Sequence, residues 1–325
     1  MKTSAIIRIV CWLVVACVLV GVLLWGITRG GGPGLSFNIF PIGCVTRNFN
    51  QINGFTPLKG TMGEYSSDNS YEVNLGSIDT ILIDWVDGSV RVTPYDGTAI
   101  AFNENATGGI PEKYALRYAV DDSTLIIQYC NINISWDNDS WWRDGKTLEV
   151  LVPKALAGKF SELAIDAVSA EISVSDIRGD KLRFDAVSGT VNADTIEADT
   201  LTFDTTSGEI EVSACTADSV KAGTVSGTIR LDGLFNTVST DTVSGSVSIT
   251  SSVCPSKVDV DSVSGSSTIV IPENNGFTAR YNSVSGGFSC DFPVTTSDNK
   301  AVYGDGSAAF TFNSVSGGIR IEKIG

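Results

Sequence analysis

Histidine is absent from this chain of 325 residues. A Ser-His-Asp hydrolase, a Cys-His protease and a His-ligated metal centre all need an imidazole ring, so these three kinds of site are excluded. Enzymes that use paired carboxylates alone are still possible. The acids here stand at repeat-related positions or in scattered turns, as on a solvated surface. We therefore predict a protein with no catalytic residue, no cofactor and no metal site.

Basic residues are also few, because 22 Lys and Arg stand against 37 Asp and Glu, which gives a formal net charge of −15. Nucleic acids and anionic lipid surfaces are bound through basic patches, so the charge argues against both as partners. Cysteine is scarce as well, and the sequence has no Cys-x-x-Cys pair that would suggest a zinc site. A disulfide between Cys44 and Cys130 is left open.

Charge is missing altogether from residues 9–27, which are rich in Val, Leu and Ile. A run of this length can cross a bilayer as a helix, and Lys2 and Arg8 before it favour a cytoplasmic N-terminus. We predict a cytoplasmic tail at 1–8, a single transmembrane helix at 9–28 in the cell membrane, and an extracellular remainder. A cleaved signal peptide and a lipoprotein acylated at Cys17 are the alternatives. Residues 29–75, rich in Gly, Asn, Ser and Pro, predict a flexible stalk.

The second half of the chain is repetitive. Val-Ser-Gly or a close variant recurs eight times, and the successive serines are 19, 19, 19, 18, 20, 21 and 31 residues apart. A nearly fixed period of this length predicts one supersecondary unit stacked on copies of itself. The eight serines are Ser169, Ser188, Ser207, Ser226, Ser244, Ser264, Ser285 and Ser316.

Each repeat predicts a strand, a tight turn and a second strand. Apolar residues stand six and four positions before the serine, as at Leu182 and Phe184, with a polar residue between them. Apolar residues return three and five positions after it, as at Ile172 and Val174. This alternation is typical of strands with one buried face. The sequence therefore predicts an all-β, two-sheet β-solenoid of about 19-residue repeats, preceded by the transmembrane helix.

Glycine follows the serine in seven of the eight copies, and Ala170 replaces it in the first. A position that is nearly always glycine predicts a backbone with positive φ. The glycines of this predicted turn ladder are Gly189, Gly208, Gly227, Gly245, Gly265, Gly286 and Gly317.

An acid or amide stands three residues before the serine in seven copies, with Gly223 as the exception. Asp and Asn commonly hydrogen-bond turn backbone, so we expect a structural role for this column. A row of calcium-binding carboxylates is disfavoured, because the calcium-binding nonapeptide of β-rolls has a different layout. The acids of the column are Asp166, Asp185, Asp204, Asp241 and Asp261.

An earlier copy of the turn occurs at Asp84-Trp-Val-Asp-Gly-Ser89. The solenoid is therefore expected to start near residue 76, with irregular first rungs and a cap over 76–160 and regular repeats over 161–325. Within the irregular part, Trp136, Trp141 and Trp142 lie among acids and amides. Such rings stack on sugars, which makes these tryptophans candidate ligand-binding residues; alternatively they pack one end of the core.

The Asp-x-Val-Ser-Gly turns, such as Asp185–Gly189 and Asp241–Gly245, resemble those of the bacterial putative-adhesin family, a family of domains of unknown function. The resemblance covers roughly residues 76–325. It implies a two-sheet superhelix, similar in shape to pectin-lyase-like helices but without their catalytic residues, and a role in adhesion. Some relatives occur in envelope-stress contexts. The family offers no functional residue to transfer.

We therefore expect a membrane-anchored, extracellular adhesin or surface-interaction module that binds a cell-surface glycan or protein. An envelope-stress accessory protein acting on a neighbouring membrane protein is one alternative, and a polysaccharide-active enzyme is another. The last nine residues, 317–325, are expected to form an open last rung guarded by Arg320, Glu322 and Lys323. Open strand edges invite pairing, so end-to-end self-association is expected there.

Overall fold

The computed structural model describes residues 58–74, 76, 78–130, 145–157 and 160–324. The predicted tail, the predicted membrane helix and most of the predicted stalk lie outside these residues. Within the described ranges, no helix is long and apolar enough to cross a membrane. The helical element found there is one 3-10 turn, η1 (Glu112–Tyr114).

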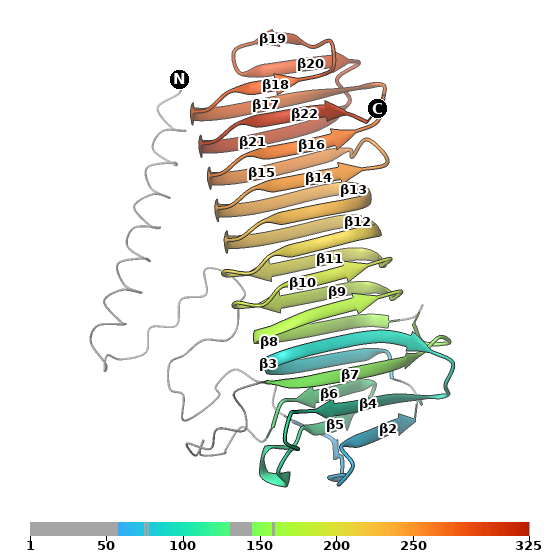
Figure 1. The fold of residues 1–325 in the computed structure, drawn as a ribbon. Coiled ribbons are helices and arrows are strands. Elements are labelled where there is room, and N and C mark those ends of the chain that lie inside the picture. The colour runs from blue at the N-terminus through green and yellow to red at the C-terminus, as the bar shows by residue number, and fades with distance from the viewer. Residues whose placement is uncertain (1–57, 75, 77, 131–144, 158–159, 325) are drawn as a thin grey trace, which may run out of the picture. The chain divides into compact units, whose positions relative to one another are not determined.

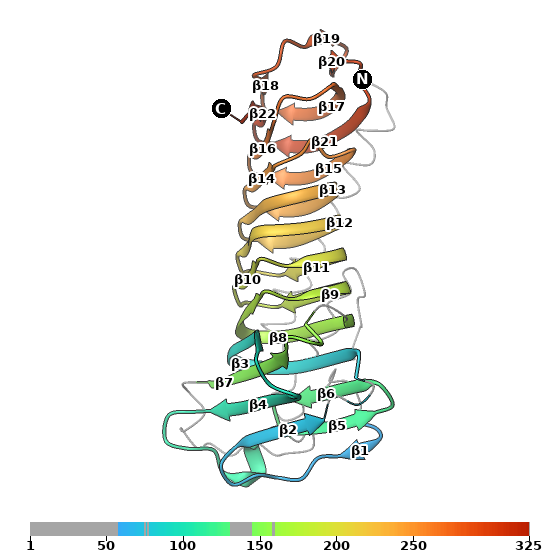
Figure 2. The ribbon, with the colours of Figure 1, turned by 90° about the vertical axis from the view of Figure 1, so that its right-hand side faces the viewer.

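Strands dominate the described residues, as expected for an all-β protein. Hydrogen bonds join 22 of them into one sheet, which winds into a stack of rungs (Figure 1). Each rung contributes to two layers. Layer 1 contains the residues before the Val-Ser-Gly turn, and layer 2 contains the residues after it; Figure 2 shows the stack turned by 90°.

The strands of the first part are β1 (Thr61–Met62), β2 (Ser70–Asn74), β3 (Thr80–Tyr95), β4 (Ala99–Asn105), β5 (Arg117–Asp121), β6 (Thr124–Gln128) and β7 (Lys146–Pro153). The strands of the repeats are β8 (Phe160–Ser175), β9 (Arg178–Ala186), β10 (Val191–Asp194), β11 (Glu197–Thr205), β12 (Ile210–Ser226), β13 (Ile229–Ser244), β14 (Val247–Ser251), β15 (Lys257–Ser264), β16 (Ser267–Ile271), β17 (Gly276–Ser285), β18 (Phe288–Cys290), β19 (Thr295–Ser297), β20 (Lys300–Gly304), β21 (Ala308–Ser316) and β22 (Ile319–Lys323).

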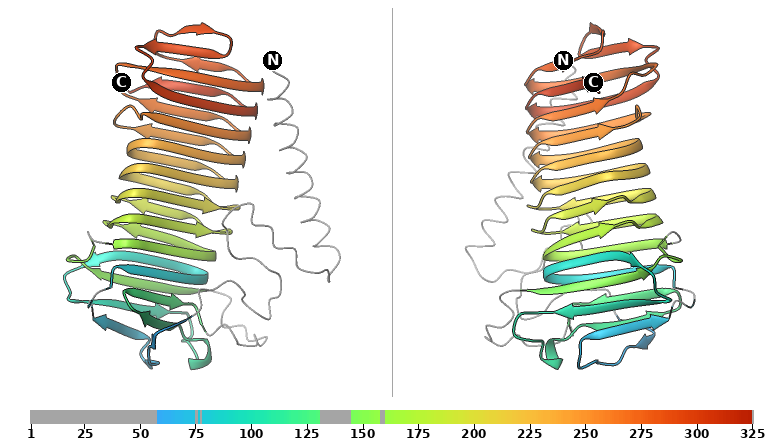
Figure 3. Two further views of the ribbon diagram at one scale, coloured as in Figure 1. Left: turned by 180° about the vertical axis from the view of Figure 1, so that it is seen from behind. Right: turned by 45° about the vertical axis from the view of Figure 1, so that its right-hand side comes forward.

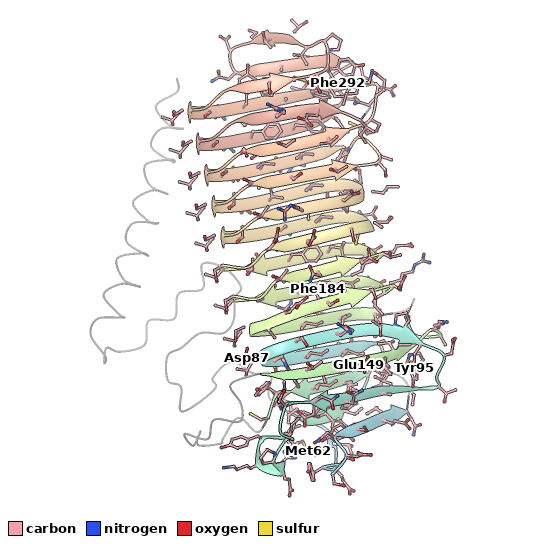
Figure 4. The ribbon with its side chains drawn as sticks, in the orientation of Figure 1. Met62, Asp87, Tyr95, Glu149, Phe184 and Phe292 are labelled. Atoms are coloured by element: carbon pink, nitrogen blue, oxygen red, sulfur yellow. The ribbon has the colours of Figure 1, made fainter. Side chains whose placement is uncertain are left out.

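Neighbouring rungs run parallel, in the register that the repeats predict. Leu201 pairs with Leu182 on one side and with Val220 on the other, and Phe203 pairs with Phe184. These side chains point between the two layers and are buried. The Phe184 and Phe203 ring centroids are 5.7 Å apart. The core is therefore a set of apolar columns running along the stack, and Figure 4 places Phe184 in one of its rungs.

The turn glycines are required mainly because neighbouring rungs approach closely. φ is positive at Gly265 (144°) and Gly317 (148°) but negative at the other five turn glycines, so the predicted positive φ is wrong for most of the column. A Cβ on Gly245 would lie 1.7 Å from the carbonyl oxygen of Gly227 in the adjacent rung. No side chain fits in that space, because real Cβ contacts are about twice as long.

At the N-terminal end of the stack, β3 is not the outermost rung. Its layer 1 half pairs with β6 and its layer 2 half with β7, although both strands come later in the sequence. Strands β5 and β4 then add in antiparallel orientation, followed by β1 and β2. Figure 3 shows this group closing one end of the parallel stack.

The C-terminal end also departs from sequence order. Strands β21 and β22, which end the chain, lie between β15–β16 and β17–β18 (Figure 1). The expectation that residues 317–325 form an open last rung is therefore wrong. The terminal rung is β17–β18. The long last interval of the repeat contains β20, which pairs with part of β17 in antiparallel orientation, and β19, which pairs with β20.

Replacement of a turn glycine tests the close approach between rungs. Gly245→Ala is expected to lower the free energy of unfolding by at least about 2 kcal/mol, because the new methyl group displaces the adjacent rung. Gly287→Ala is the matched control, since its Cβ would have no atom within 4 Å, and should change stability by less than about 0.5 kcal/mol. Denaturant unfolding of both variants checks this. Equal losses would contradict the explanation.

Candidate binding surface

Layer 2 carries a patch of hydroxyl groups on its outer face. In β14, Val247 and Ile249 point inward, so Ser248 and Thr250 face outward. In β16 the same alternation turns Thr268 and Val270 outward. Ser248 pairs with Thr268 in the next rung, so the backbones that carry these two hydroxyls lie about 4.8 Å apart along the stack. We call this group the hydroxyl patch; its members are Thr228, Ser246, Ser248, Thr250, Ser266 and Thr268.

Two arginines border the hydroxyl patch, one in β13 and one in β22. Arg230 pairs in register with Ser248, and Arg320 pairs with Thr268. Both arginines form exposed ion pairs, Arg230 with Glu209 and Arg320 with Glu322 at 3.2 Å. The patch itself therefore has no charged residue, whereas both positively and negatively charged side chains lie along its borders. Each hydroxyl can donate and accept hydrogen bonds, which suits a ligand with many hydroxyl or amide groups.

The predicted acidic column lies on the outer side of layer 1, close to the turn. Its hydrogen bonds differ from those expected, because they reach neighbouring side chains. Arg183 donates to both carboxylate oxygens of Asp166, at 2.7 and 2.9 Å, and also contacts Asp185. Further along, Asn313 donates to Asp261 at 2.7 Å.

Other residues make the contacts to turn backbone that were expected of the acidic column. Thr205, one position closer to the serine, accepts a hydrogen bond from the Gly208 amide at 2.9 Å. Asp87, at the serine position of the earliest copy, accepts one from Gly88 at 2.8 Å. Figure 4 shows Asp87 at the turn edge of the stack. The hydrogen bonds to turn backbone that were expected of the acidic column are therefore made by Thr205 and Asp87, which lie closer to the turn.

Stacked carboxylates perturb one another in this column. Burial, with the adjacent Asp166 and Asp204 carboxylates, raises the pKa of Asp185 to about 7 despite the opposing effect of Arg183. Burial and the Asp241 charge raise the pKa of Asp204 to about 6. Asp204 also occupies the space that Gly223 leaves, since a Cβ there would lie 2.4 Å from its Oδ1. Asp185 and Asp204 therefore hold their protons to a higher pH than ordinary carboxyl groups do.

A polar network is buried in the cap, below Trp85. Lys146 is fully buried and its Nζ lies 2.6 Å from Glu104 Oε2. The same ammonium group donates to the carbonyl oxygens of Tyr114, at 2.9 Å, and Tyr129, and lies 4.0 Å from the Tyr129 ring centroid. Trp85 Nε1 donates to the Lys146 carbonyl at 3.1 Å. Desolvation lowers the pKa of Lys146. These contacts fix the antiparallel cap to the first parallel rung.

The remaining predicted residues have separate outcomes. Trp136, Trp141 and Trp142 lie outside the described residues, as does Cys44 of the possible disulfide. Cys130 is buried in the core. Within the part of the chain that the structure describes, no group of three or more acids and cysteines is arranged to hold a metal ion.

Three features of the structure were not predicted from the sequence: the Lys146–Glu104 pair, the bridge that Arg183 forms between Asp166 and Asp185, and the position of the hydroxyl patch. A charged residue at the start of a strand usually lies in solvent, so Lys146 gave no signal of burial. The alternation of Ser248 and Thr250 with apolar residues in β14 is the signal that could have shown this face.

Comparison with known proteins gives a family match. A family model described as Toastrack DUF4097 matches residues 78–322. No curated protein matches the chain.

Three solved structures are similar at 11–14% sequence identity. A putative cell adhesion protein from Clostridium sporogenes is 11% identical, with 82% of this chain and 100% of that chain covered and a TM-score of 0.28. A putative adhesin from Bacteroides fragilis is 14% identical, with coverages of 78% and 95% and a TM-score of 0.44. A putative lipid binding protein from Parabacteroides distasonis is 13% identical, with coverages of 81% and 98% and a TM-score of 0.41.

The acidic column predicts a pH-dependent stability. The folded pKa values of Asp185 and Asp204 lie above the ordinary value of 3.8, so the folded state holds protons more tightly than the unfolded chain. These two carboxyl groups should therefore contribute most to the free energy of unfolding below about pH 4, where they are protonated in both states. Their contribution should fall as the pH rises to about 7. Asp185→Asn should raise it at pH 8 by roughly 1–3 kcal/mol and flatten this slope. Unfolding curves from pH 4 to 8 measure both effects; an unchanged slope in the variant would sink the explanation.

Proposed function

This chain belongs to the Toastrack DUF4097 family, and on that premise we propose that it is a membrane-anchored, extracellular interaction module that binds an uncharged glycan without catalysis. Residues 9–28 are its proposed single-pass anchor, with the N-terminus in the cytoplasm. The hydroxyl patch is the observation that carries the proposal of glycan binding. Its neutral, regularly spaced hydroxyls match the repeating hydroxyl groups of an extended polysaccharide.

Charge supports an uncharged ligand in preference to an anionic one. The chain carries a net charge of −15, so an anionic polymer is repelled unless a basic patch receives it. Arg230 and Arg320 beside the patch are already paired with Glu209 and Glu322. An uncharged sugar polymer avoids this repulsion and can lie across the adjacent rungs of β14 and β16, where Ser248 pairs with Thr268.

Alanine variants of the full chain test the proposed surface on an array of glycans and envelope polymers. The patch variant carries Ser246→Ala, Ser248→Ala and Thr268→Ala. Its matched control carries Thr200→Ala, Thr202→Ala and Ser239→Ala on the outer face of layer 1. The patch variant should lose at least about tenfold in affinity, since hydrogen bonds to the ligand disappear, and the control should stay within about twofold.

A third variant, with Trp136, Trp141 and Trp142 changed to alanine, tests the alternative site suggested by the sequence. Loss of binding in this variant alone would move the glycan site away from layer 2. If the unsubstituted chain binds no glycan on the array, the glycan proposal fails, and a neighbouring membrane protein becomes the preferred partner.

A further inference from the structure

The terminal rung, β17–β18, has an open edge over its second half. Strand β20 covers β17 from Gly276 to Arg280, and the Tyr281 amide still donates to Asn299 at 2.9 Å. From residue 282 onward, no described strand lies beyond this rung, and β18 pairs with β22 alone. The segment 282–290 is consequently the place where the parallel stack stops without a covering strand.

The open edge carries a defined set of hydrogen-bonding groups. In the four successive pairs of neighbouring rungs before this edge, the N–H of the turn glycine donates to the carbonyl of the turn serine in the next rung. Gly245, for example, donates to Ser264 at 3.0 Å. The residue two positions later donates to the next rung as well, as Val247 does to Ser266 at 2.9 Å. By this pattern, the terminal rung directs the Gly286 and Phe288 N–H groups outward, beyond the described strands.

The same edge also presents an acceptor. In the earlier rungs, the carbonyl of the residue before the serine accepts a bond from the next rung, as Val168 does from Ser188 at 2.9 Å. Its counterpart in the terminal rung is the Val284 carbonyl. A two-fold axis at Gly286 brings the Phe288 N–H of each copy opposite the Val284 carbonyl of the other. The hydrogen-bond donors and the acceptor of this edge are therefore complementary to those of a second copy that runs antiparallel to it.

The side chains of the edge suit contact with a second copy. Val284 is 60% exposed, more than the four other exposed large apolar residues of the described chain. Behind it, the Tyr281 and Phe288 rings stack at 4.2 Å and close the core. The ten residues 281–290 include no charged residue, although the chain has a net charge of −15. Two copies can therefore meet here with little of the repulsion that opposes contact elsewhere.

The opposite end of the stack lacks these properties. Strands β1 and β2 at that end are antiparallel additions, and Glu64 and Glu72 lie in or beside them. A head-to-tail fibre would require this charged, antiparallel end to receive the parallel terminal rung. A closed pair of C-terminal ends avoids that mismatch.

We propose that two copies of this chain associate through the open edge of their terminal rungs, residues 282–290, around a two-fold axis near Gly286. This surface is separate from the hydroxyl patch, so its partner is a second copy and not the glycan. The contact includes only the end of one rung, which makes it smaller than a standard protein interface and predicts a reversible, concentration-dependent dimer.

Sedimentation equilibrium of the full chain in density-matched detergent tests the proposal. Unsubstituted chain should show a monomer–dimer equilibrium. Val284→Asp places two like charges near the axis and should weaken the dimer at least about tenfold. Val243→Asp makes the same change at the equivalent turn position of an interior rung, and should leave the dissociation constant unchanged.

Each result decides the proposal. Loss of the dimer in Val284→Asp alone supports it, and circular dichroism of that variant should match the unsubstituted chain. A monomer at every concentration overturns it. A dimer that survives Val284→Asp also overturns it, because association then runs through another surface such as the predicted membrane segment.

Discussion

The close approach of neighbouring rungs at the Val-Ser-Gly turn is the constraint on which the rest of the structure depends. A turn glycine such as Gly245 leaves no room for a side chain against the carbonyl of the rung before it. Once the turns are stacked this tightly, the two arms of every rung are held in register. Apolar residues then stack on apolar residues to form the core, and hydroxyls stack on hydroxyls to form the outer face.

The same register also stacks groups that repel one another. Asp185 and Asp204 are direct register neighbours, and their raised pKa values reflect burial and this proximity. Arg183 offsets the repulsion at one end of the column, and the missing side chain of Gly223 gives Asp204 space in the middle. A repeat that stacks identical residues also stacks identical charges, so some rungs must carry a different residue. Arg183 and Gly223 are such residues, and they occur where the acids of the column are most buried.

Much of the fold could be predicted from the sequence, because alternation and period are local patterns. The strand, turn and strand of each repeat and the register of β9, β11 and β12 follow directly from them. The order of the last rungs could not be predicted, because Ala279–Tyr281 and Phe310–Phe312 carry the same pattern and either could stack on β15. The cap pair Lys146–Glu104 joins residues 42 positions apart, and no local pattern signals such a contact. For the candidate surface, the repeat register places Ser248 beside Thr268, but the contact of Thr268 with Arg320 follows from the order of the last rungs and could not be predicted.

Residue-resolved hydrogen exchange of the Val284→Asp variant, in which the proposed dimer does not protect the open edge, tests the rung order most directly. In the observed order, the Ile319 amide donates to the Gly287 carbonyl at 2.9 Å inside the stack, whereas the Phe288 amide belongs to the open edge. The account predicts slow exchange at Ile319 and fast exchange at Phe288. If rungs instead stacked in sequence order, Phe288 would be protected by the rung after it and Ile319 would exchange rapidly. That result would contradict the account.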